Sequence, residues 1–318
     1  MTKTVWILSD GKKGTENQSV GLANAMGWKN YLLKPIDVKF PWALLPPRLW
    51  FDPLKAVKKS KELFPDNTWP DILIAAGRIC AAVAAEIRRQ AQGKTFVIFI
   101  QYPYMDPKNF DVVITPEHDD IQGDNVIKVF GALHNVTADK LKKASFHHNN
   151  LIEYLPKPRV AVLIGGKNRH YKMTPALMEQ YGSQLRHIAK RKTISYMVTG
   201  SRRTPVACLQ AFKKGLGSAP AFVWNGRGDN PYYAFLAAAD IVIVTSDSVS
   251  MVSEAMFTNK PLYVMELEGK SAKLDKFLAS VYKKQRARPF SKDIEKWSYA
   301  PVDTMGKVSV ELKKFLPK

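Results

Sequence analysis

Residues 240–255 are the part of the chain best suited to bind a phosphate. A buried strand is predicted to end at Thr245, a hydroxyl-rich turn follows, and a helix is predicted to begin near Ser248. Backbone N–H groups, hydroxyls and the positive end of the helix dipole would then face one point, as phosphate binding requires. Glu254 shares a helix face with Ser250, where its carboxylate could accept hydrogen bonds from both hydroxyls of a ribose. The alternative is that Ser248 only caps the helix and Glu254 is solvated.

Two further turns in the same half, each after a predicted strand, add glycines and cations. Gly165 and Gly166 would let the backbone approach an anion closely, although an ordinary tight turn would explain them equally well. Arg202 and Arg203 follow the next strand, and arginine forks suit diphosphate oxygens. Three strand ends on one sheet edge thus carry anion-binding chemistry. The predicted nucleotide and diphosphate site comprises Gly165, Gly166, Lys167, Ser201, Arg202, Arg203, Asn230, Ser246, Asp247, Ser248, Ser250 and Glu254.

The N-terminal half offers groups that could take the proton of an attacking hydroxyl. Asp10 and Glu16 lie in a glycine-containing turn after the first strand, and either could be a general base. His118, flanked by carboxylates after a later strand, is another candidate. Equally, Asp10 could fix the turn, Asn17 could cap the helix, and His118 could be an ordinary surface histidine. On the acceptor side we expect Gly14, Asn17, Gln18, Arg78 and Gln101.

Residues 40–51 concentrate aromatic side chains, leucines and prolines. Such a loop could dip into a bilayer interface, with its tryptophans at the depth of the head groups and several lysines just behind. The expected membrane contacts are Trp42, Leu45, Trp50 and Phe51. A Pro-rich connection packed on its own domain would explain the segment equally well.

The elements that must position these residues alternate between strand and helix along the chain. Apolar, β-branched runs predict strands at residues 4–8, 71–75, 96–100, 112–115, 160–164, 194–198, 222–224, 240–245 and 261–265. Helical periodicity predicts helices at residues 17–26, 78–90, 175–190, 205–214 and 249–257. This alternation is typical of right-handed βαβ units on a parallel sheet, whose ligands bind at the carboxyl ends of the strands.

The pattern restarts after a polar and Pro-bearing stretch at residues 147–158. A chain of 318 residues is also about the length of two ordinary domains. We therefore expect two doubly wound, Rossmann-like α/β domains, residues 1–152 and 153–318, facing a central cleft. The basic C-terminal helices could pack back on the first domain.

The net charge of +20 is unevenly distributed along the chain. Residues 1–150 hold 20 Lys and Arg against 15 Asp and Glu, and residues 151–318 hold 28 against 13, which gives +5 and +15. Such a field attracts anionic lipid, phosphorylated ligands or nucleic acid. The chain has no RNP aromatics, zinc-finger spacing or helix-turn-helix pattern, so nucleic acid is not expected as a partner.

Other classes of site and location are excluded by what the sequence lacks. No Cys and His cluster has metal-ligand spacing and no dinucleotide fingerprint is complete, so we expect neither a metal nor a cofactor. Cys80 and Cys208 lie in apolar helical patterns, as buried thiols in a reducing cytoplasm would. The first residues are too short for a signal peptide, and the apolar stretch at 72–87 is too interrupted to span a membrane.

Seven motifs, taken in order, resemble the Elm-type mitochondrial-fission family over nearly the whole chain. They are Ser-Asp-Gly-x-x-Gly-x-x-Asn-Gln, Ala-Ala-Gly-Arg, Thr-Pro-Glu-His-Asp, Ile-Gly-Gly, Gly-Ser-Arg-Arg-Thr-Pro, Asn-Pro-Tyr and Val-Thr-Ser-Asp-Ser-Val-Ser-Met-Val-Ser-Glu-Ala. Bacterial members of that family are often labelled as nucleoside-diphosphate-sugar enzymes. The resemblance therefore implies a nucleotide-sugar as ligand.

More distantly, the layout is similar to that of GT-B glycosyltransferases, especially the peripheral-membrane enzyme that adds N-acetylglucosamine to a lipid-linked peptidoglycan precursor. In that class the C-terminal domain holds the nucleotide, and a glutamate on a helix after a Ser/Thr-rich turn binds ribose. Glu254 stands in the matching position, with Ser248 and Ser250 in the matching turn. Relatives often have His after the second glycine of the N-terminal turn, where this chain has Thr15, so the base is left open.

Three functional hypotheses follow from these residues and resemblances. The first is a metal-independent GT-B glycosyltransferase, transferring a hexose or N-acetylhexosamine from a nucleotide-diphosphate sugar to a lipid or glycolipid acceptor. The expected location is the cytoplasmic face of the membrane, with an anionic membrane surface or lipid-linked acceptor as partner. The second is a non-catalytic, membrane-associated adaptor, as the fission family implies. The third is a sugar-nucleotide epimerase.

Overall fold

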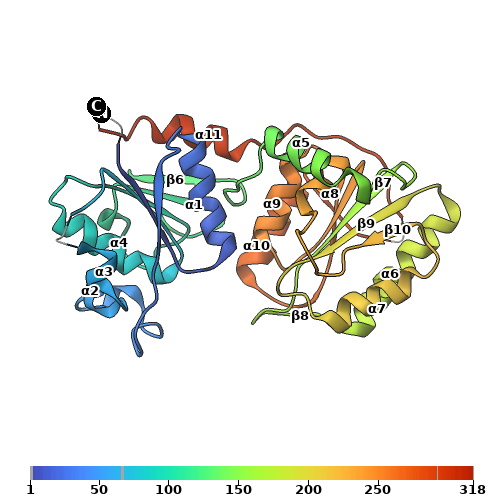
Figure 1. The fold of residues 1–318 in the computed structure, drawn as a ribbon, viewed down its shortest axis with the longest axis horizontal. Coiled ribbons are helices and arrows are strands. Elements are labelled where there is room, and N and C mark those ends of the chain that lie inside the picture. The colour runs from blue at the N-terminus through green and yellow to red at the C-terminus, as the bar shows by residue number, and fades with distance from the viewer. Residues whose placement is uncertain (1–2, 66–67, 292, 318) are drawn as a thin grey trace. The chain divides into compact units, whose positions relative to one another are not determined.

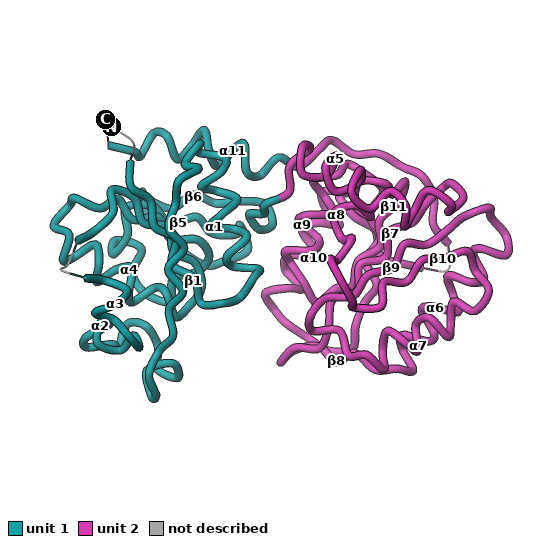
Figure 2. The backbone as a smooth tube through the Cα atoms, in the orientation of Figure 1, with its two compact units in different colours: residues 1–135, 303–318 teal, residues 136–302 magenta. Residues whose placement is uncertain are grey.

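The computed structural model describes residues 3–65, 68–291 and 293–317. The chain divides into two compact units (Figure 2). Unit 1 comprises residues 1–135 and 303–318, and unit 2 comprises residues 136–302. Each unit has its own sheet and its own core, as the sequence pattern predicts.

Unit 1 is built on a parallel sheet with the strand order β2-β1-β3-β4-β5-β6. Its strands are β1 (Val5–Ser9), β2 (Tyr31–Pro35), β3 (Ile72–Ala76), β4 (Phe96–Ile100), β5 (Val112–Pro116) and β6 (Val126–Val129). From β1 the chain first adds β2 on one side and then adds the remaining strands on the other. The direction of winding therefore reverses between β1 and β3, and ligands of open α/β sheets bind at such a point.

Helices cover both faces of this sheet (Figure 1). They are α1 (Lys13–Ala25), α2 (Pro53–Ala56), α3 (Ser60–Leu63), α4 (Arg78–Gln90) and α11 (Thr304–Leu312), with short 3-10 turns at Pro47–Leu49 and Pro107–Asn109. Helix α11 packs on α1 and β6, and α2 packs on α4. One apolar core lies on each face, because the buried strands carry apolar side chains in both directions.

Unit 2 repeats this architecture with the strand order β10-β9-β7-β11-β12-β14. Its strands are β7 (Arg159–Ile164), β9 (Ser195–Gly200), β10 (Ala221–Val223), β11 (Ile241–Thr245), β12 (Leu262–Met265) and β14 (Arg288–Pro289), and β8 (Tyr171–Lys172) pairs separately with β13 (Glu268–Gly269). Winding reverses between β7 and β11. Ile164 pairs with Gly200, and Leu163 pairs with Val244, so these three strands end level with one another.

The helices of unit 2 lie on both sides of its sheet (Figure 1). They are α5 (Ala138–His147), α6 (Pro175–Arg191), α7 (Val206–Leu216), α8 (Tyr232–Ala238), α9 (Val249–Phe257) and α10 (Ala272–Lys283), with a 3-10 turn at Asn149–Leu151. Helices α6 and α7 pack on each other, and α5 packs on α8. The N-cap serine or threonine of α5, α6, α9 and α10 accepts a hydrogen bond from a backbone N–H of the first turn, which fixes where each helix begins.

The predicted fold class, an α/β chain with two doubly wound parallel sheets, is confirmed. The sequence pattern does not predict four of these elements, β2, β6, α5 and α8. Strand β2 is a largely exposed edge strand, and α5 has no buried residue, so neither has a clear apolar pattern. The division falls at Asn135, earlier than the expected residue 152, since α5 packs with unit 2. Within the described residues, no helix combines the length and apolar character needed to cross a membrane.

Candidate functional site

The ends of three neighbouring strands in unit 2 meet around the buried carboxylate of Asp247. This carboxylate accepts hydrogen bonds from the N–H of Gly166 at 3.0 Å and from the hydroxyl of Thr245 at 2.6 Å. It also forms an ion pair of 2.9 Å with the guanidinium of Arg203. The Asp247 side chain has no exposed surface, whereas that of Arg203 is 45% exposed. Asp247 thus joins the turns after β7, β9 and β11.

The two glycines after β7 are required by the packing of these turns on one another. A Cβ atom on Gly165 would lie 2.1 Å from a carboxylate oxygen of Asp247, and one on Gly166 would lie 2.2 Å from the carbonyl oxygen of Arg203. The N–H of Gly165 donates to the hydroxyl of Thr245 at 2.8 Å. The N–H groups of both glycines are thus bound within the protein, which differs from the expected role of leaving the backbone open to an anion.

The predicted cations after β7 and β9 fall into two groups. Arg203 helps to hold the turns around Asp247 together, since it also donates to the carbonyl of Gly166 at 3.3 Å. The neighbouring Ser201 also joins these turns, because its hydroxyl donates a hydrogen bond of 2.8 Å to the carbonyl of Gly165. Lys167 and Arg202 are exposed. A ligand at this sheet edge could therefore reach both.

Helix α9 begins directly after the third of these turns. The hydroxyl of Ser248 caps the helix by accepting from the N–H of Met251 at 3.3 Å, and the hydroxyl of Ser246 accepts from the N–H of Leu267 at 3.0 Å. The earlier N–H groups of a helix have no partner within it and carry the positive end of its dipole. The amino end of α9, with half-buried Ser250 in its first turn, is therefore suited to an anion.

Glu254 lies on α9 and is buried, which excludes the alternative that it is a solvated surface residue. One of its carboxylate oxygens accepts a hydrogen bond of 2.5 Å from the hydroxyl of Tyr232 on α8. Burial raises the pKa of Glu254 to about 7, against the opposing effects of that hydrogen bond and of the positive charge of Lys140. Glu254 is therefore a buried carboxyl group that titrates near neutral pH.

Lys140 and Tyr233 complete the surroundings of this glutamate. Lys140 comes from α5, and its ammonium group lies 4.3 Å from the centre of the Tyr233 ring. Burial lowers the pKa of Lys140, while the charge of Glu254 acts in the opposite direction. An ammonium group held over an aromatic face close to a carboxylate is stabilised by both.

Asn230 connects Glu254 to the strand ends. Its side-chain oxygen accepts from the hydroxyl of Thr199 at 2.7 Å and from the N–H of Tyr232 at 3.0 Å, and its amide nitrogen donates to the carbonyl of Gly200 at 3.2 Å. A chain of hydrogen bonds thus links the end of β9 through Asn230 and Tyr232 to Glu254. The motif Asn-Pro-Tyr was the available sequence signal for Tyr232, whereas nothing in the sequence pointed to Lys140.

In unit 1, the carboxylate of Asp10 is hydrogen-bonded within its own turn. Its side chain has no exposed surface and accepts from the ammonium of Lys12 at 2.6 Å and from the hydroxyl of Thr15 at 2.7 Å. A Cβ on Gly77, at the end of β3, would lie 2.9 Å from the same carboxylate. Glu16 accepts a hydrogen bond from the hydroxyl of Ser9 at 3.1 Å and forms an ion pair with Lys13. Its side chain is 13% exposed.

The other predicted residues of unit 1 follow different strands of the same sheet edge. His118 is half-buried after β5, a strand that lies three positions, or roughly 14 Å, from β1, the strand that precedes Asp10. Gln101 follows β4 with a φ of +83°, a strained backbone for a residue other than glycine, and its amide donates to the side chain of Gln18 at 3.3 Å. Asn17 does not cap α1, because the helix begins at Lys13 with exposed Gly14 in its first turn.

Arg78 binds the backbone of the aromatic loop at residues 40–51. Its guanidinium donates to the carbonyl of Leu45 at 2.9 Å and to that of Ala43. Trp50 is buried, with its indole N–H also donating to Leu45 at 3.3 Å, and it packs against the half-buried Trp42. Arg78, predicted on the acceptor side, thus holds this loop against unit 1.

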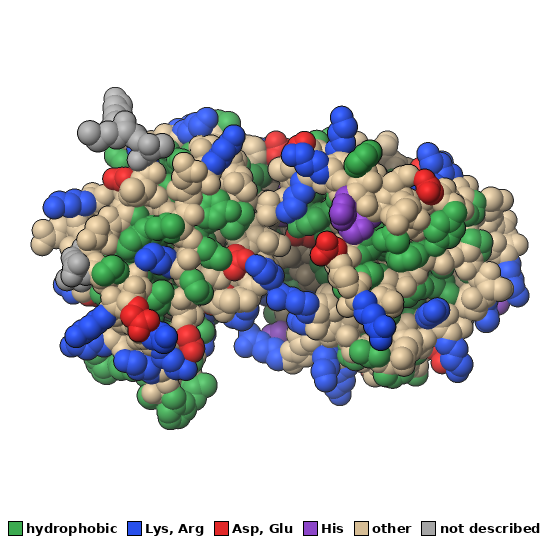
Figure 3. Space-filling model, viewed as in Figure 1, with side chains coloured by type: hydrophobic (Ala, Val, Ile, Leu, Met, Phe, Trp, Pro, Cys, Tyr) green, Lys and Arg blue, Asp and Glu red, His purple; other side chains and the backbone are tan. Residues whose placement is uncertain are grey.

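Other side chains of the loop point to solvent. Those of Phe40, Leu44 and Phe51 are 82%, 73% and 93% exposed. Figure 3 shows hydrophobic side chains gathered at this end of unit 1 with lysine and arginine side chains beside them. Of the four predicted membrane contacts only Phe51 is exposed, since Trp42, Leu45 and Trp50 pack inward.

Unit 2 carries more positive charge than unit 1. Unit 2 holds 27 Lys and Arg against 12 Asp and Glu, so most of the positive charge lies on the unit that contains Asp247 and Glu254. Among the residues that the structure describes, no group of three or more His, Cys, Asp and Glu is placed to hold a metal ion.

Comparison with protein families gives one match over nearly the whole chain. The model of the family described as mitochondrial fission ELM1 matches residues 13–316. Mitochondrial fission protein ELM1 of Arabidopsis thaliana is 32% identical over 274 residues, which cover 78% of this chain and 64% of that protein. The match therefore spans less than two thirds of the plant protein. The uncharacterized protein RP120 of Rickettsia prowazekii (strain Madrid E) is 28% identical over 354 residues, covering 99% of this chain and 98% of that protein.

Solved structures with the same fold are glycosyltransferases and sugar-nucleotide epimerases. MurG of Acinetobacter baumannii matches with a TM-score of 0.52 and 12% identity, over 98% of this chain and 90% of that one. Arabidopsis thaliana UGT89C1, solved in complex with UDP, matches with a TM-score of 0.51 and 12% identity, over 99% and 92%. UDP-GlcNAc 2-epimerase of Methanocaldococcus jannaschii matches with a TM-score of 0.55 and 12% identity, over 98% and 99%. These similarities establish the GT-B type of fold.

Proposed function

Because the chain belongs to the mitochondrial fission ELM1 family and has a GT-B type of fold, we propose that it transfers a sugar from a nucleotide-diphosphate sugar to a lipid or glycolipid acceptor. The observation that carries this proposal is the placement of Glu254. It is a buried carboxyl group on α9, the helix whose amino end follows the reversal of strand order in unit 2. Anions and nucleotides bind at such helix ends in open α/β sheets.

In this proposal the amino end of α9 binds the diphosphate, with Lys167 and Arg202 as countercharges. Arg203 acts indirectly, because its ion pair with Asp247 holds the turns of the site in place. UDP is the first nucleotide to test, because the structurally similar UGT89C1 was solved in complex with it. As the bond between sugar and diphosphate breaks, negative charge develops on the leaving diphosphate, and cations and helix N–H groups stabilise it in the part that a metal ion plays elsewhere.

Glu254 binds the ribose in its ionised form. A carboxylate has about four acceptor positions, so it can keep the hydrogen bond from Tyr232 and still accept from two ribose hydroxyls. Tyr232 is then a positioning residue, because it fixes the direction of the carboxylate without contacting the sugar that is transferred.

Unit 1 holds the acceptor, whose hydroxyl loses a proton as its oxygen attacks the sugar. Both carboxylate oxygens of Asp10 are engaged by its own turn, so we assign it to fixing that turn. Glu16 and His118 are the remaining candidates for the base. They follow different strands, and substituting each in turn distinguishes them.

The acceptor is proposed to be membrane-associated because of the loop at residues 40–51. Phe40, Leu44 and Phe51 expose large apolar side chains next to a group of exposed lysines at positions 39, 55, 58, 59 and 61. Apolar side chains can enter the bilayer interface while lysines interact with anionic head groups. The protein would therefore act at the cytoplasmic face of a membrane without spanning it.

Isothermal titration calorimetry with UDP tests the nucleotide assignment. We expect the wild-type protein to bind UDP and Glu254→Ala to bind it at least tenfold more weakly, since two hydrogen bonds to a charged group are lost. Glu179→Ala, which removes a carboxylate from the surface of α6, is the matched control and should bind like the wild type. Absence of UDP binding, or equal binding by Glu254→Ala, would contradict the assignment.

Two other functions are favoured by specific comparisons. The epimerase of similar fold suggests sugar-nucleotide epimerisation, and the family description suggests a fission adaptor. Incubation with UDP-sugars separates the three. A transferase releases UDP only when an acceptor is present, an epimerase converts the sugar without an acceptor, and an adaptor does neither.

A further inference from the structure

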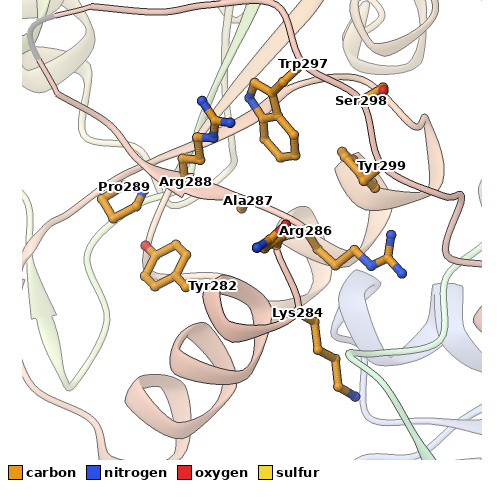
Figure 4. A pocket seen from close by; sticks show the side chains of 10 residues that line it. Tyr282, Lys284, Arg286, Ala287, Arg288, Pro289, Trp297, Ser298 and Tyr299 are labelled. Atoms are coloured by element: carbon orange, nitrogen blue, oxygen red, sulfur yellow. The ribbon is translucent and has the colours of Figure 1, made fainter.

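Unit 2 contains a cavity of about 530 Å³ that none of the preceding site residues line. It is formed by the end of α10, the edge strand β14 and residues 297–299 (Figure 4). Helix α10 returns the chain from the carboxyl end of β12 to the amino end of the parallel strand β14. The cavity therefore lies at the edge of the sheet opposite the turns that surround Asp247, and its volume is in the range of small-molecule sites.

Cationic and aromatic side chains line this cavity together. The guanidinium of Arg288 lies 4.8 Å from the centre of the Trp297 ring, and that of Arg286 lies 5.7 Å from the centre of the Tyr299 ring. Figure 4 shows Arg288 beside Trp297. A guanidinium stacked on a ring keeps its N–H groups free to bind an anion at its edge. Lys284 also belongs to the lining.

In the described part of the chain, neither Arg286 nor Arg288 has a strong ion pair with a neighbouring carboxylate. Arg288 has a long ion pair of 3.6 Å with Glu295, and the side chains of both are at least half exposed, so the pair is weak. Arg286 donates to the carbonyl of Ala300 at 2.8 Å, which orients its guanidinium without removing its charge. The two arginines thus keep most of their positive charge for a ligand.

Two buried polar atoms in the lining also lack an acceptor. Within the described residues, the indole nitrogen of Trp297 and the hydroxyl of Tyr282 are buried and have no hydrogen-bond partner. A buried donor without an acceptor costs about 1–3 kcal/mol, so proteins seldom retain one without an occupant or a water that satisfies it. Both groups can donate, and an oxyanion accepts several such bonds at once.

We propose that this cavity binds a small soluble phosphate ester that carries a flat, apolar group. The phosphate would interact with Arg288 and accept from the adjacent Trp297 after a small adjustment of its ring (Figure 4). The flat group would pack on the aromatic walls. This site is separate from the proposed nucleotide site and does not depend on it.

Phenyl phosphate is a suitable probe, because it has the phosphate and the flat group but no ribose or diphosphate. Binding is measured by calorimetry with the full-length protein, alone and with saturating UDP. We expect millimolar or tighter binding that UDP leaves unchanged. Arg288→Gln should weaken it at least tenfold, and Trp297→Phe, which keeps the ring but removes the N–H, should weaken it several-fold.

The matched control removes two positive charges close to the cavity but outside its lining. Lys283→Gln combined with Lys296→Gln should bind phenyl phosphate like the wild type, since both lysines are exposed and neither lines the cavity. Arg288 is half exposed, so Arg288→Gln should fold normally, which circular dichroism checks. Failure of phenyl phosphate to bind, or wild-type binding by both Arg288→Gln and Trp297→Phe, would overturn the proposal. Neither outcome bears on UDP binding.

Discussion

The hydroxyl of Tyr232 donates a hydrogen bond of 2.5 Å to the buried carboxylate of Glu254. Burial and the charge of Glu254 raise the pKa of Tyr232 well above its usual value, so the hydroxyl stays protonated and remains a donor at neutral pH. Because Asn230 fixes the backbone of Tyr232 to the end of β9, the direction of Glu254 depends on a strand end as well as on α9.

Tyr232→Phe should therefore disturb Glu254 while preserving the packing of the ring. It removes a buried hydrogen bond to a charged group, so we expect a loss of about 1–3 kcal/mol in the free energy of unfolding at pH 8. Urea unfolding measures this loss. Tyr233→Phe, which removes the same atom from the next residue, is the control and should change stability by less than about 0.5 kcal/mol. Equal losses in the two variants would contradict a specific role for Tyr232.

The affinity for UDP should rise with pH because the proposed ribose contact needs an ionised Glu254. Its pKa is raised to about 7, so the carboxyl is mostly neutral at pH 6 and mostly ionised at pH 8. We expect up to about tenfold tighter binding at pH 8 than at pH 6. Calorimetry across this range measures it. Glu254→Gln records the part due to the phosphate itself, which titrates near pH 6, and an identical pH profile in that variant would rule out Glu254 as the group responsible.

Arg202 and Arg203 should differ in what they contribute, although they are adjacent. Arg203→Gln leaves the buried Asp247 without its ion pair, and we expect a loss of about 1–2 kcal/mol of stability, discounted because Arg203 is 45% exposed. Arg202→Gln should leave stability within about 0.5 kcal/mol and weaken UDP binding about tenfold. Urea unfolding and calorimetry on both variants test this division, and the reverse pattern would show that the roles are exchanged.

Gly165→Ala should destabilise unit 2. The added Cβ would lie 2.1 Å from a carboxylate oxygen of Asp247, so the turns after β7 and β11 must move apart. We expect a cost of about 1–3 kcal/mol from this overpacking. In the control Gly123→Ala, the nearest atom is the flexible side chain of Asn125 at 3.1 Å, and the cost should be smaller. Thermal or urea unfolding compares the two, and a Gly165→Ala variant as stable as Gly123→Ala would show that the turns are not held together as described.

Adjacent aromatic residues in the loop at 40–51 should affect different properties. Phe51→Ser should weaken co-sedimentation with anionic liposomes and leave stability nearly unchanged, because Phe51 is 93% exposed. Trp50→Ala should cost about 3–5 kcal/mol of stability, because Trp50 is 7% exposed and packs in the core. Co-sedimentation with neutral liposomes is the control, because it removes the electrostatic attraction between the lysines and anionic head groups. If Phe51→Ser binds anionic liposomes like the wild type, the loop is not the membrane contact.

Much of the fold could be predicted from the sequence because it depends on local patterns. The buried strands β3, β4 and β11 are continuous apolar runs, and the amphipathic helix α4 follows its predicted bounds. Helix α9 also begins where Ser248 predicts, because an N-cap acts through the first turn of its own helix. The strand β2 could not be recognised, since it is a largely exposed edge strand without a continuous apolar run.

The sequence by itself thus determined that Gly165 and Arg203 follow strand ends and that Glu254 lies on the helix after β11. Only the tertiary structure decided what they do there. It assigns Gly165 and Arg203 to the packing around Asp247, and it brings Lys140 from another helix to Glu254. The physical reason is that propensity and periodicity act between near neighbours in the chain, whereas burial, ion pairing and the pKa of a carboxyl group depend on residues that only folding brings together.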